Sequence, residues 1–320
     1  MPLAWVAYST PVVTSARLAL QVGLRPIAFV FCIFVLAVAV GALRWRVLLQ
    51  AYDAPSVPPF LSLLRTTFLG LYFGLLPGAV GGDVVRAYRT RHAAGGLVQS
   101  MMVVFVDRLA GLFGLLALVA AFGFWGPPSR SSLAVDLTRS AAAIAMLLAL
   151  LSLGAPWLPK LWPGLGRTLR RAPGVLKELG TLRPPRDAAR LAAACGLSCI
   201  TQAAVIGCLT YLVVQVSPGV EIFRVLQVAP LVVLLTFVPL TPLGIGQREV
   251  VFVSIWGIAG VSSTAALSAS LLAFLVTVGV SSTGGLVVLL ERSSTKAEPA
   301  PEPRPASGES EASLPVSKDR

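Results

Sequence analysis

The stretch Val250–Leu290 decides the class of fold. It reads VVFVSIWGIAGVSSTAALSASLLAFLVTVGVSSTGGLVVLL and carries no charged side chain over 41 positions. A helix needs about 20 apolar residues to cross the hydrocarbon core of a bilayer, so this stretch is long enough for two passes. The strands of a membrane barrel would alternate apolar and polar residues, and this stretch does not. It therefore predicts membrane helices.

Uncharged runs recur along the chain, at Pro26–Leu43, at Leu191–Val216 and at Val225–Gln247. Lipid cannot satisfy exposed backbone polar groups, and a helix satisfies its own. We predict an all-α integral membrane protein with about six to eight transmembrane or re-entrant helices. An inverted repeat is one arrangement that fits this pattern.

The composition excludes an ordinary soluble domain. Hydrophobic residues make up 56% of the 320 and charged residues 12%, and the mean hydropathy is +0.81. Soluble domains carry about 25% charged residues. Folded in water, this chain would leave too much apolar surface exposed.

The formal charge of +12 raises the question of a nucleic-acid partner. Half of that charge lies in one segment, at about 160–190, which has eight basic and two acidic residues. Apart from Trp162, no aromatic pattern suited to base stacking accompanies it. Basic residues concentrate on cytoplasmic loops of membrane proteins. We therefore expect a basic cytoplasmic loop and no nucleic-acid partner.

Residues for metal or covalent chemistry are scarce. The four cysteines lie inside apolar runs, and His92 is the single histidine of the sequence. The sequence has no GxSxG, HExxH or Walker A motif. We expect no metal, no cofactor and no enzyme activity.

The chain divides into a membrane domain at 1–292 and a tail. Residues 1–25 are mildly apolar but interrupted, and we interpret them as the end of a helix whose beginning is absent. The next span is expected to close at Arg44-Trp45-Arg46. Residues 293–320 are rich in Pro, Ser, Glu and Ala, which predicts a disordered cytoplasmic tail.

The loop charges also predict an orientation. If 160–190 is cytoplasmic, both sides of segment 60–82 are cytoplasmic, and both sides of segment 225–260 are external. Each segment would then enter the membrane and return, from opposite faces. The alternative is that one or both simply cross. We expect the chain in the inner (plasma) membrane of a bacterium.

The first of these segments contains a break just before Asp83 and Arg86. Three glycines and a proline within six residues cannot continue a helix, so the backbone must open there. Free N–H groups at the start of the next helix attract anions, and Arg86 would add a charge. The alternative is a tight turn capped by Asp83. The helix-breaking residues are Pro77, Gly78, Gly81 and Gly82.

The second segment has the same pattern before Arg248 and Glu249. Its helix-breaking residues are Pro242, Gly244 and Gly246. A pair of Gly/Pro-interrupted segments in two halves of a chain is a pointer to a binding site at the middle of the membrane. The pair is more specific than either break alone.

Asp107 and Arg108 interrupt an otherwise apolar helix at about 97–125. Charges inside a membrane are costly and usually face the protein interior, so each residue needs a partner. Asp107 with Arg86 and Arg108 with Glu249 are two candidate pairings that the sequence does not rank. We expect all of these charges, with Arg248, to face one polar cavity. The alternative is that Asp107 and Arg108 lie at the membrane surface.

Arg44, Trp45 and Arg46 have a simpler interpretation. Trp is enriched at the membrane surface and Arg extends toward it, so an interface anchor is the expected role. Binding of a lipid phosphate is the alternative.

Taken together, these motifs resemble the flippase-like transmembrane family, represented by the membrane half of lysylphosphatidylglycerol synthetase. The resemblance covers roughly residues 3–292. Leu243 stands where the family has a glycine, and only 28 residues follow Arg292, where family synthetases carry a soluble aminoacyltransferase domain. The residues that match family elements are Arg44, Trp45, Arg46, Leu76, Pro77, Gly78, Gly81, Gly82, Asp83, Arg86, Asp107, Arg108, Pro242, Gly244, Gly246, Arg248 and Glu249.

The resemblance implies translocation of a lipid or lipid-linked glycan, without synthetase activity. The expected partner is a membrane lipid with an anionic head group, held by Arg86, Arg108 and Arg248 with the nearby carboxylates. Two alternatives remain: a non-transporting subunit that holds a lipid or a lipid-modifying enzyme, and an intramembrane enzyme acting on a lipid-linked substrate.

Overall fold

The computed structural model describes residues 12–75, 81–124, 187–237 and 246–296, with residues 140, 143, 144, 146 and 147. Within these ranges the regular structure is helical and contains no strand. The helices are α2 (Val12–Gln21), α3 (Leu24–Ala51), α4 (Phe60–Gly74), α5 (Gly81–Ala94), α6 (Leu97–Phe124), α11 (Ala188–Val216), α12 (Ile222–Phe237), α13 (Gln247–Ile258) and α14 (Ser263–Lys296).

Helices α3, α6, α11 and α14 are long and apolar enough to cross a membrane. Helices α4 and α12 are apolar but shorter, with 15 and 16 residues. At 1.5 Å per residue they reach about 22–24 Å, less than the roughly 30 Å of a hydrocarbon core. The predicted fold class, all-α with spanning and shorter membrane helices, is confirmed.

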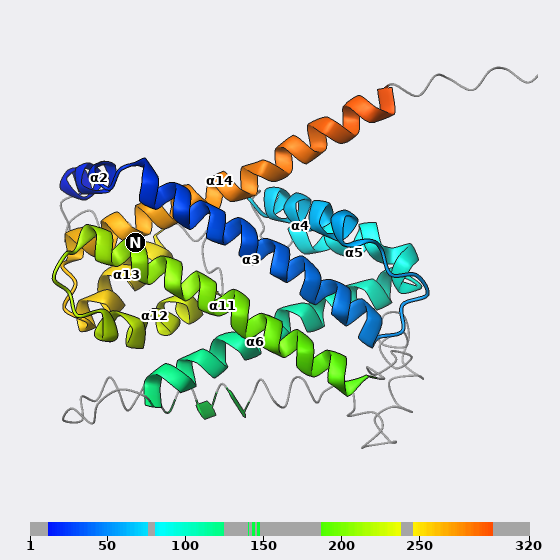
Figure 1. The fold of residues 1–320 in the computed structure, drawn as a ribbon, viewed down its shortest axis with the longest axis horizontal. Helices are drawn as coiled ribbons and strands as arrows, with labels where there is room; N and C mark the ends of the chain where they lie inside the picture. Colours follow the sequence, from blue (N-terminus) through cyan, green and yellow to red (C-terminus); the bar gives the residue numbers. More distant parts are fainter. Residues whose placement is uncertain are drawn as a thin grey trace, which may run out of the picture.

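Helices α4 and α5 form a pair: α4 begins and α5 ends at the same end of the bundle. The amide of Ser56, before α4, donates to the Ala93 carbonyl near the end of α5 at 3.3 Å. At the same end, Arg190 at the start of α11 donates to the Gln50 carbonyl of α3 at 3.1 Å. Figure 1 shows α4 and α5 beside the half of α3 that leads to this end.

Helices α12 and α13 form the corresponding pair at the opposite end. There α3 begins beside the end of α11, with the rings of Phe29 and Tyr211 centred 5.3 Å apart. Helix α2 is held to the first turns of α14, where the Ser268 hydroxyl donates to the Ser15 carbonyl at 2.8 Å. The two pairs thus open toward opposite ends (Figure 1). The first predicted returning segment, 60–82, is too short, because the returning helix is α5 and ends at Ala94.

Glycines allow three close contacts between helix backbones. A Cβ at Gly82 of α5 would lie 2.2 Å from the Gly70 carbonyl oxygen of α4. A Cβ at Gly284 of α14 would lie 2.1 Å from the Phe68 carbonyl oxygen, and one at Gly114 of α6 would lie 2.7 Å from the Ser198 carbonyl carbon. Small residues at helix contacts are characteristic of membrane bundles.

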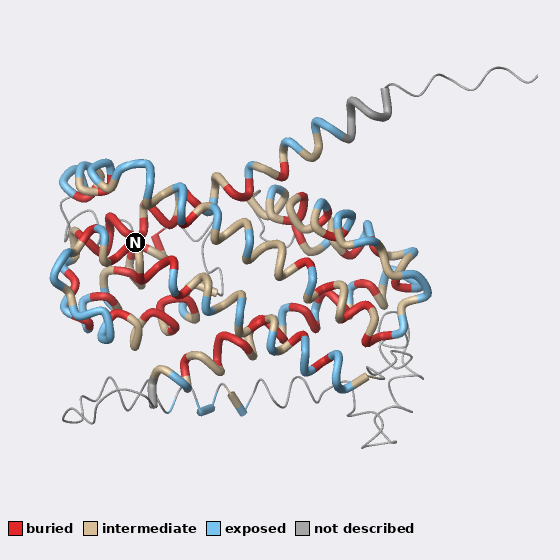
Figure 2. Tube along the Cα trace, viewed as in Figure 1, coloured by how far each residue is buried: buried red, intermediate tan, exposed pale blue. Residues whose placement is uncertain are grey.

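Two apolar cores hold the bundle together. The larger core joins α2, α3, α6, α11, α12, α13 and α14, around Trp256 and Phe252. The smaller core lies between the ends of α3, α4, α5, α6 and α11, around Trp45, Leu48 and Leu63. Figure 2 shows buried positions recurring along these helices, whereas α2 is largely exposed.

Two predicted boundaries are wrong. Helix α3 does not close at Arg44-Trp45-Arg46 but continues to Ala51, and α14 continues to Lys296, four residues into the predicted tail. Arg44 is accommodated within the helix because its partners, Asp107 and Ser198, lie on α6 and α11. The basic loop up to residue 186, the breaks at 76–80 and 238–245, and the tail from 297 lie outside the described residues.

Candidate functional site

A buried carboxylate on α6 joins two other helices. The side chain of Asp107 is 3% exposed. Its Oδ1 accepts from Arg44 Nε of α3 at 2.7 Å, and its Oδ2 accepts from Arg86 Nη2 of α5 at 3.0 Å. Both carboxylate oxygens are therefore paired with guanidinium groups, which are the strongest donors that a carboxylate meets in proteins. The predicted pairing of Asp107 with Arg86 is confirmed.

Arg44 extends this contact to a fourth helix. Its Nη1 donates to the Ser198 hydroxyl of α11 at 3.1 Å, and that hydroxyl donates to the Ala194 carbonyl at 2.9 Å. Gly111 of α6 lies against the guanidinium, with a Cβ there at 3.5 Å from Arg44 Nη1, an ordinary packing distance. The planar guanidinium can bridge a carboxylate and a hydroxyl at once.

Trp45 lies under the same group of charges. It is 0% exposed, and the Arg86 guanidinium carbon lies 4.3 Å from the centre of its ring. A cation over an indole ring is favourable, and more so away from water. The expected role of Arg44, Trp45 and Arg46 as an interface anchor is therefore wrong for Trp45 and Arg44. These two side chains pack inside the bundle because their partners are there.

Arg108 belongs to the outer edge of this network. Its Nε donates to Asp83 Oδ2 at 2.5 Å, and Arg86 Nη1 lies 4.0 Å from Asp83 Oδ1. The candidate pairing of Arg108 with Glu249 is therefore wrong. Asp83 stands in the first turn of α5, where a negative charge is favoured by the helix dipole.

We call Arg44, Asp83, Arg86, Asp107 and Arg108 the central cluster. Three guanidinium groups against two carboxylates leave one excess positive charge. Exposure rises along the network, from Asp107 at 3% through Asp83 at 22% to Arg108 at 49% of the side chain. The cluster therefore has a closed inner end and an open outer edge at Arg108.

Arg248 and Glu249 form a second group, which we call the α13 cluster. Gly246 adopts φ 85, a conformation suited to glycine, and its N–H donates to Glu249 Oε2 at 2.5 Å. Glu249 Oε1 lies 3.4 Å from Arg248 Nη2 and from the Ser270 hydroxyl. The Arg248 guanidinium carbon lies 4.6 Å from the centre of the Phe274 ring.

The two clusters lie apart, so the expectation of one shared cavity is not supported. On helix α14, Ser270 contacts the α13 cluster, whereas Gly284 contacts α4, the helix whose Gly70 packs against the Arg86 side chain of the central cluster. Fourteen residues separate these positions, or about 20 Å along a helix. Among the described side chains, the ion pairs of Asp107 and Asp83 stay within the central cluster, and that of Glu249 stays within the α13 cluster.

Sequence reasoning missed the part that Arg44 and Ser198 play. Arg44 was assigned to the membrane surface, and Ser198 lies in an uncharged run without any motif. The prediction of Gly81 and Gly82 as helix-breaking residues is wrong, because they are the first two residues of α5 and Gly82 packs against the α4 backbone. Gly246 directly precedes α13. The others, Pro77, Gly78, Pro242 and Gly244, lie outside the described residues. Among the side chains that the structure does describe, no three His, Cys, Asp or Glu residues group as a metal site would require.

Comparison with known proteins agrees with this picture of a membrane bundle. A curated relative, described as a UPF0104 membrane protein from Methanothermobacter thermautotrophicus, is 37% identical over 70 residues. That match covers 22% of this chain and about a fifth, 19%, of the relative. No solved structure matches the chain. A family model described as lysylphosphatidylglycerol synthase TM region matches residues 3–285. The chain is therefore a membrane protein that belongs to the lysylphosphatidylglycerol synthase transmembrane-region family.

Proposed function

We propose that this protein binds the anionic head group of a lipid or lipid-linked glycan at the central cluster and moves it between the two leaflets. The observation that carries the proposal is the excess of one guanidinium group over carboxylates inside a bundle of membrane helices. A phosphate would neutralise that excess. The proposal involves no covalent chemistry on the lipid.

Arg108 is the natural point of entry for the head group. Its side chain is half exposed and has one described acidic partner, Asp83. A phosphate accepts two hydrogen bonds from a guanidinium, so it can take the position of the Asp83 carboxylate or share Arg108 with it. Arg86 lies behind Asp83 at 4.0 Å and would strengthen the attraction.

The depth of the cluster favours translocation over simple surface binding. Asp83 is eleven residues from the end of α5 at Ala94, and Arg108 is eleven residues from the start of α6 at Leu97. Each distance corresponds to about 16 Å of helix, roughly half of a hydrocarbon core. A head group held there would be near the middle of the bilayer, where an unpaired charge is most costly.

The orientation is part of the same proposal. The basic residues of the 160–190 segment favour the cytoplasm. The end of the bundle that carries Gln50, Ala93 and Arg190 would therefore lie on the cytoplasmic side of a bacterial plasma membrane. The rival function is a non-transporting subunit that holds a lipid or a lipid-modifying enzyme. Such a subunit could use the same cluster without moving the head group.

Lipid retention tests the binding step. The protein would be purified in detergent with equimolar phosphatidylglycerol and phosphatidylcholine, and the retained lipids measured by mass spectrometry. We expect phosphatidylglycerol to be enriched on the wild type and Arg108→Gln to remove most of the enrichment. Arg224→Gln is the matched control, because Arg224 forms an exposed ion pair with Glu221 at 2.7 Å on another helix. Equal enrichment in all three proteins would refute head-group binding at the central cluster.

A leaflet-resolved assay tests the translocation step. Liposomes with purified protein and fluorescent phosphatidylglycerol in one leaflet would be followed by quenching from outside. Faster redistribution with wild type than with Arg108→Gln supports transport. Enrichment of phosphatidylglycerol in detergent without any redistribution in liposomes would leave the non-transporting subunit as the function.

A further inference from the structure

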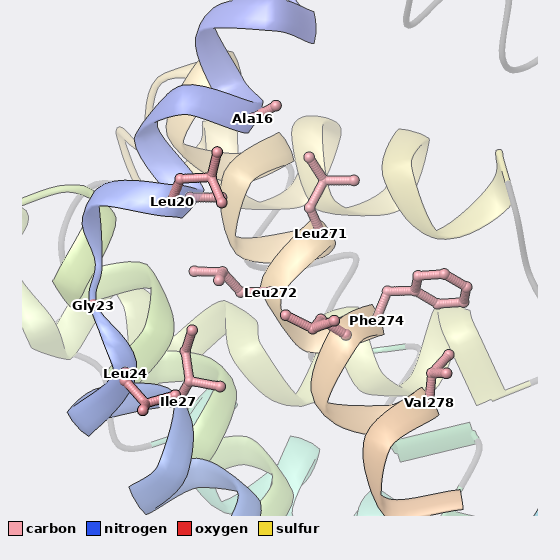
Figure 3. A pocket seen from close by; sticks show the side chains of 11 residues that line it. Ala16, Leu20, Gly23, Leu24, Ile27, Leu271, Leu272, Phe274 and Val278 are labelled. Carbon is pink, nitrogen blue, oxygen red and sulfur yellow. The ribbon is translucent and has the colours of Figure 1, made fainter. Parts of the chain in front are cut away.

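A groove between α2, α3 and α14 is lined in part by Phe274, whose ring contacts Arg248 of the α13 cluster. Its volume is about 570 Å³, within the range of small-molecule sites. Every residue that lines it is apolar or glycine. Figure 3 shows Leu20 from α2, Ile27 from α3 and Leu272 from α14 converging on the gap.

The groove exists because the chain turns between two helices. Gly23 separates α2 from α3 and adopts φ 77, so the two helices do not continue in one line. Helix α2 is instead held against α14 by the hydrogen bond from Ser268 to the Ser15 carbonyl. The space between this contact and the start of α3 is left unfilled, and Leu20 and Leu24 stand at its edge with most of their surface exposed.

Phe274 connects this apolar space to a cation. It is one of the lining residues, yet its ring points away from Leu20 and Leu24 in Figure 3, and the Arg248 guanidinium stacks on that ring. Arg248 is only weakly neutralised, since its contact with Glu249 is 3.4 Å long. Its Nε is buried and has no hydrogen-bond partner among the described residues.

We propose that the groove holds one acyl chain of an anionic phospholipid, whose phosphate binds Arg248 beside Phe274. An acyl chain suits a groove without polar lining, and hydrocarbon is what surrounds these helices in a membrane. The buried Nε supplies a donor that a phosphate oxygen satisfies, and the guanidinium supplies the charge. This second lipid site does not depend on head-group binding at the central cluster.

The probe for this site is phosphatidylglycerol with a photoreactive diazirine in one acyl chain. The intact protein would be placed in nanodiscs with this probe, irradiated, digested and mapped by mass spectrometry. We expect labelling of peptides that contain residues 16–27 and 271–278. Phosphatidylcholine with the same acyl diazirine has the same phosphate, but its choline cation cancels the net negative charge of the head group. It should therefore label these peptides about tenfold less, if the net charge is worth about 1.4 kcal/mol of attraction to Arg248.

Two variants separate the acyl chain from the head group. Ala16→Phe places a ring in the groove and should abolish labelling by both probes, whereas Ala203→Phe, at an exposed alanine of α11, should not. Arg248→Gln should lower the phosphatidylglycerol signal to that of phosphatidylcholine. Arg108→Gln should leave the groove signal unchanged, so failure at the central cluster is distinguishable from failure here.

Three results would overturn the proposal. They are unchanged groove labelling in Ala16→Phe, equal labelling by the two probes on the wild type, and labelling spread evenly over all lipid-facing helices. The last pattern would mean ordinary surrounding lipid. Loss of labelling in the wild type on raising protein density in the nanodiscs would instead assign the groove to a second copy of the chain.

Discussion

Asp107 and Arg44 lie 63 positions apart in the chain and form a 2.7 Å ion pair between α6 and α3. The pair is buried, and the second oxygen of Asp107 is occupied by Arg86. One carboxylate thus stabilises two guanidinium groups that the bundle encloses. Its removal would leave both of them without their counter-charge.

The first prediction concerns this carboxylate. Asp107→Asn should destabilise the folded protein by about 3–5 kcal/mol, because breaking one partner of a buried ion pair leaves uncompensated charge. Thermal unfolding in detergent, followed by circular dichroism, measures the loss. Glu221→Gln is the control, since its ion pair with Arg224 is more than half exposed and such pairs contribute about 0–1 kcal/mol. Equal melting temperatures for the two variants would contradict the assignment of Asp107 as the structural centre of the cluster.

The second prediction concerns Arg44, which serves two partners at once. Arg44→Lys keeps the charge but cannot donate to both the Asp107 carboxylate and the Ser198 hydroxyl from a fixed plane. We expect a loss of about 1–3 kcal/mol, the cost of leaving one buried partner unsatisfied. Arg65→Lys, at an exposed position of α4, should change the unfolding temperature little. A neutral Arg44→Lys would show that charge alone is needed at this position.

The third prediction concerns the contact of α14 with α4. Gly284→Ala should separate the two helices, because the new Cβ would lie 2.1 Å from the Phe68 carbonyl oxygen and 2.7 Å from its carbon. These are backbone atoms that cannot turn aside. Gly279→Ala is the matched control five residues earlier, where the nearest atom is a Phe31 ring carbon at 3.5 Å. Unfolding temperature and yield of folded protein should fall for Gly284→Ala alone.

Hydropathy and helix-breaking residues were enough to predict most of the helices. The uncharged run Leu191–Val216 marks α11 to within three residues, because lipid tolerates only backbone that is internally hydrogen-bonded. The run 225–247 contains most of α12, and the run 250–290 contains most of both α13 and α14. The position of the basic residues predicted two segments that return, at 60–82 and 225–260, but it missed that α5, up to Ala94, belongs to the first. These features depend on whether a segment lies in lipid or in water, and the amino-acid composition of the segment indicates which.

The partners of the charges could not be predicted in the same way. Arg44 pairs with Asp107, and Arg108 pairs with Asp83, because the rotation of each helix is set by its packing, as in the close contact of Gly82 in α5 with Gly70 in α4. That rotation depends on packing between segments distant in sequence. Spacing along one helix carries no information about it, so the sequence indicates neither the burial of Arg44 nor its contact with Ser198.

The fourth prediction concerns which residues share a side of the membrane. Ser56 and His92 belong to the end where α4 begins and α5 ends, whereas Glu221 and Ser262 belong to the end where α12 begins and α14 starts. In a variant without the four native cysteines, single cysteines would be placed at these four positions. An impermeant maleimide added outside intact cells should label the cysteines at 221 and 262. It should label those at 56 and 92 only after the membrane is opened, because basic residues concentrate at that end and favour the cytoplasm. The reverse labelling would invert the orientation but keep the fold. Labelling of 56 and 221 from the same side would contradict the fold itself, since α3 and α11 would then no longer separate the two helix pairs.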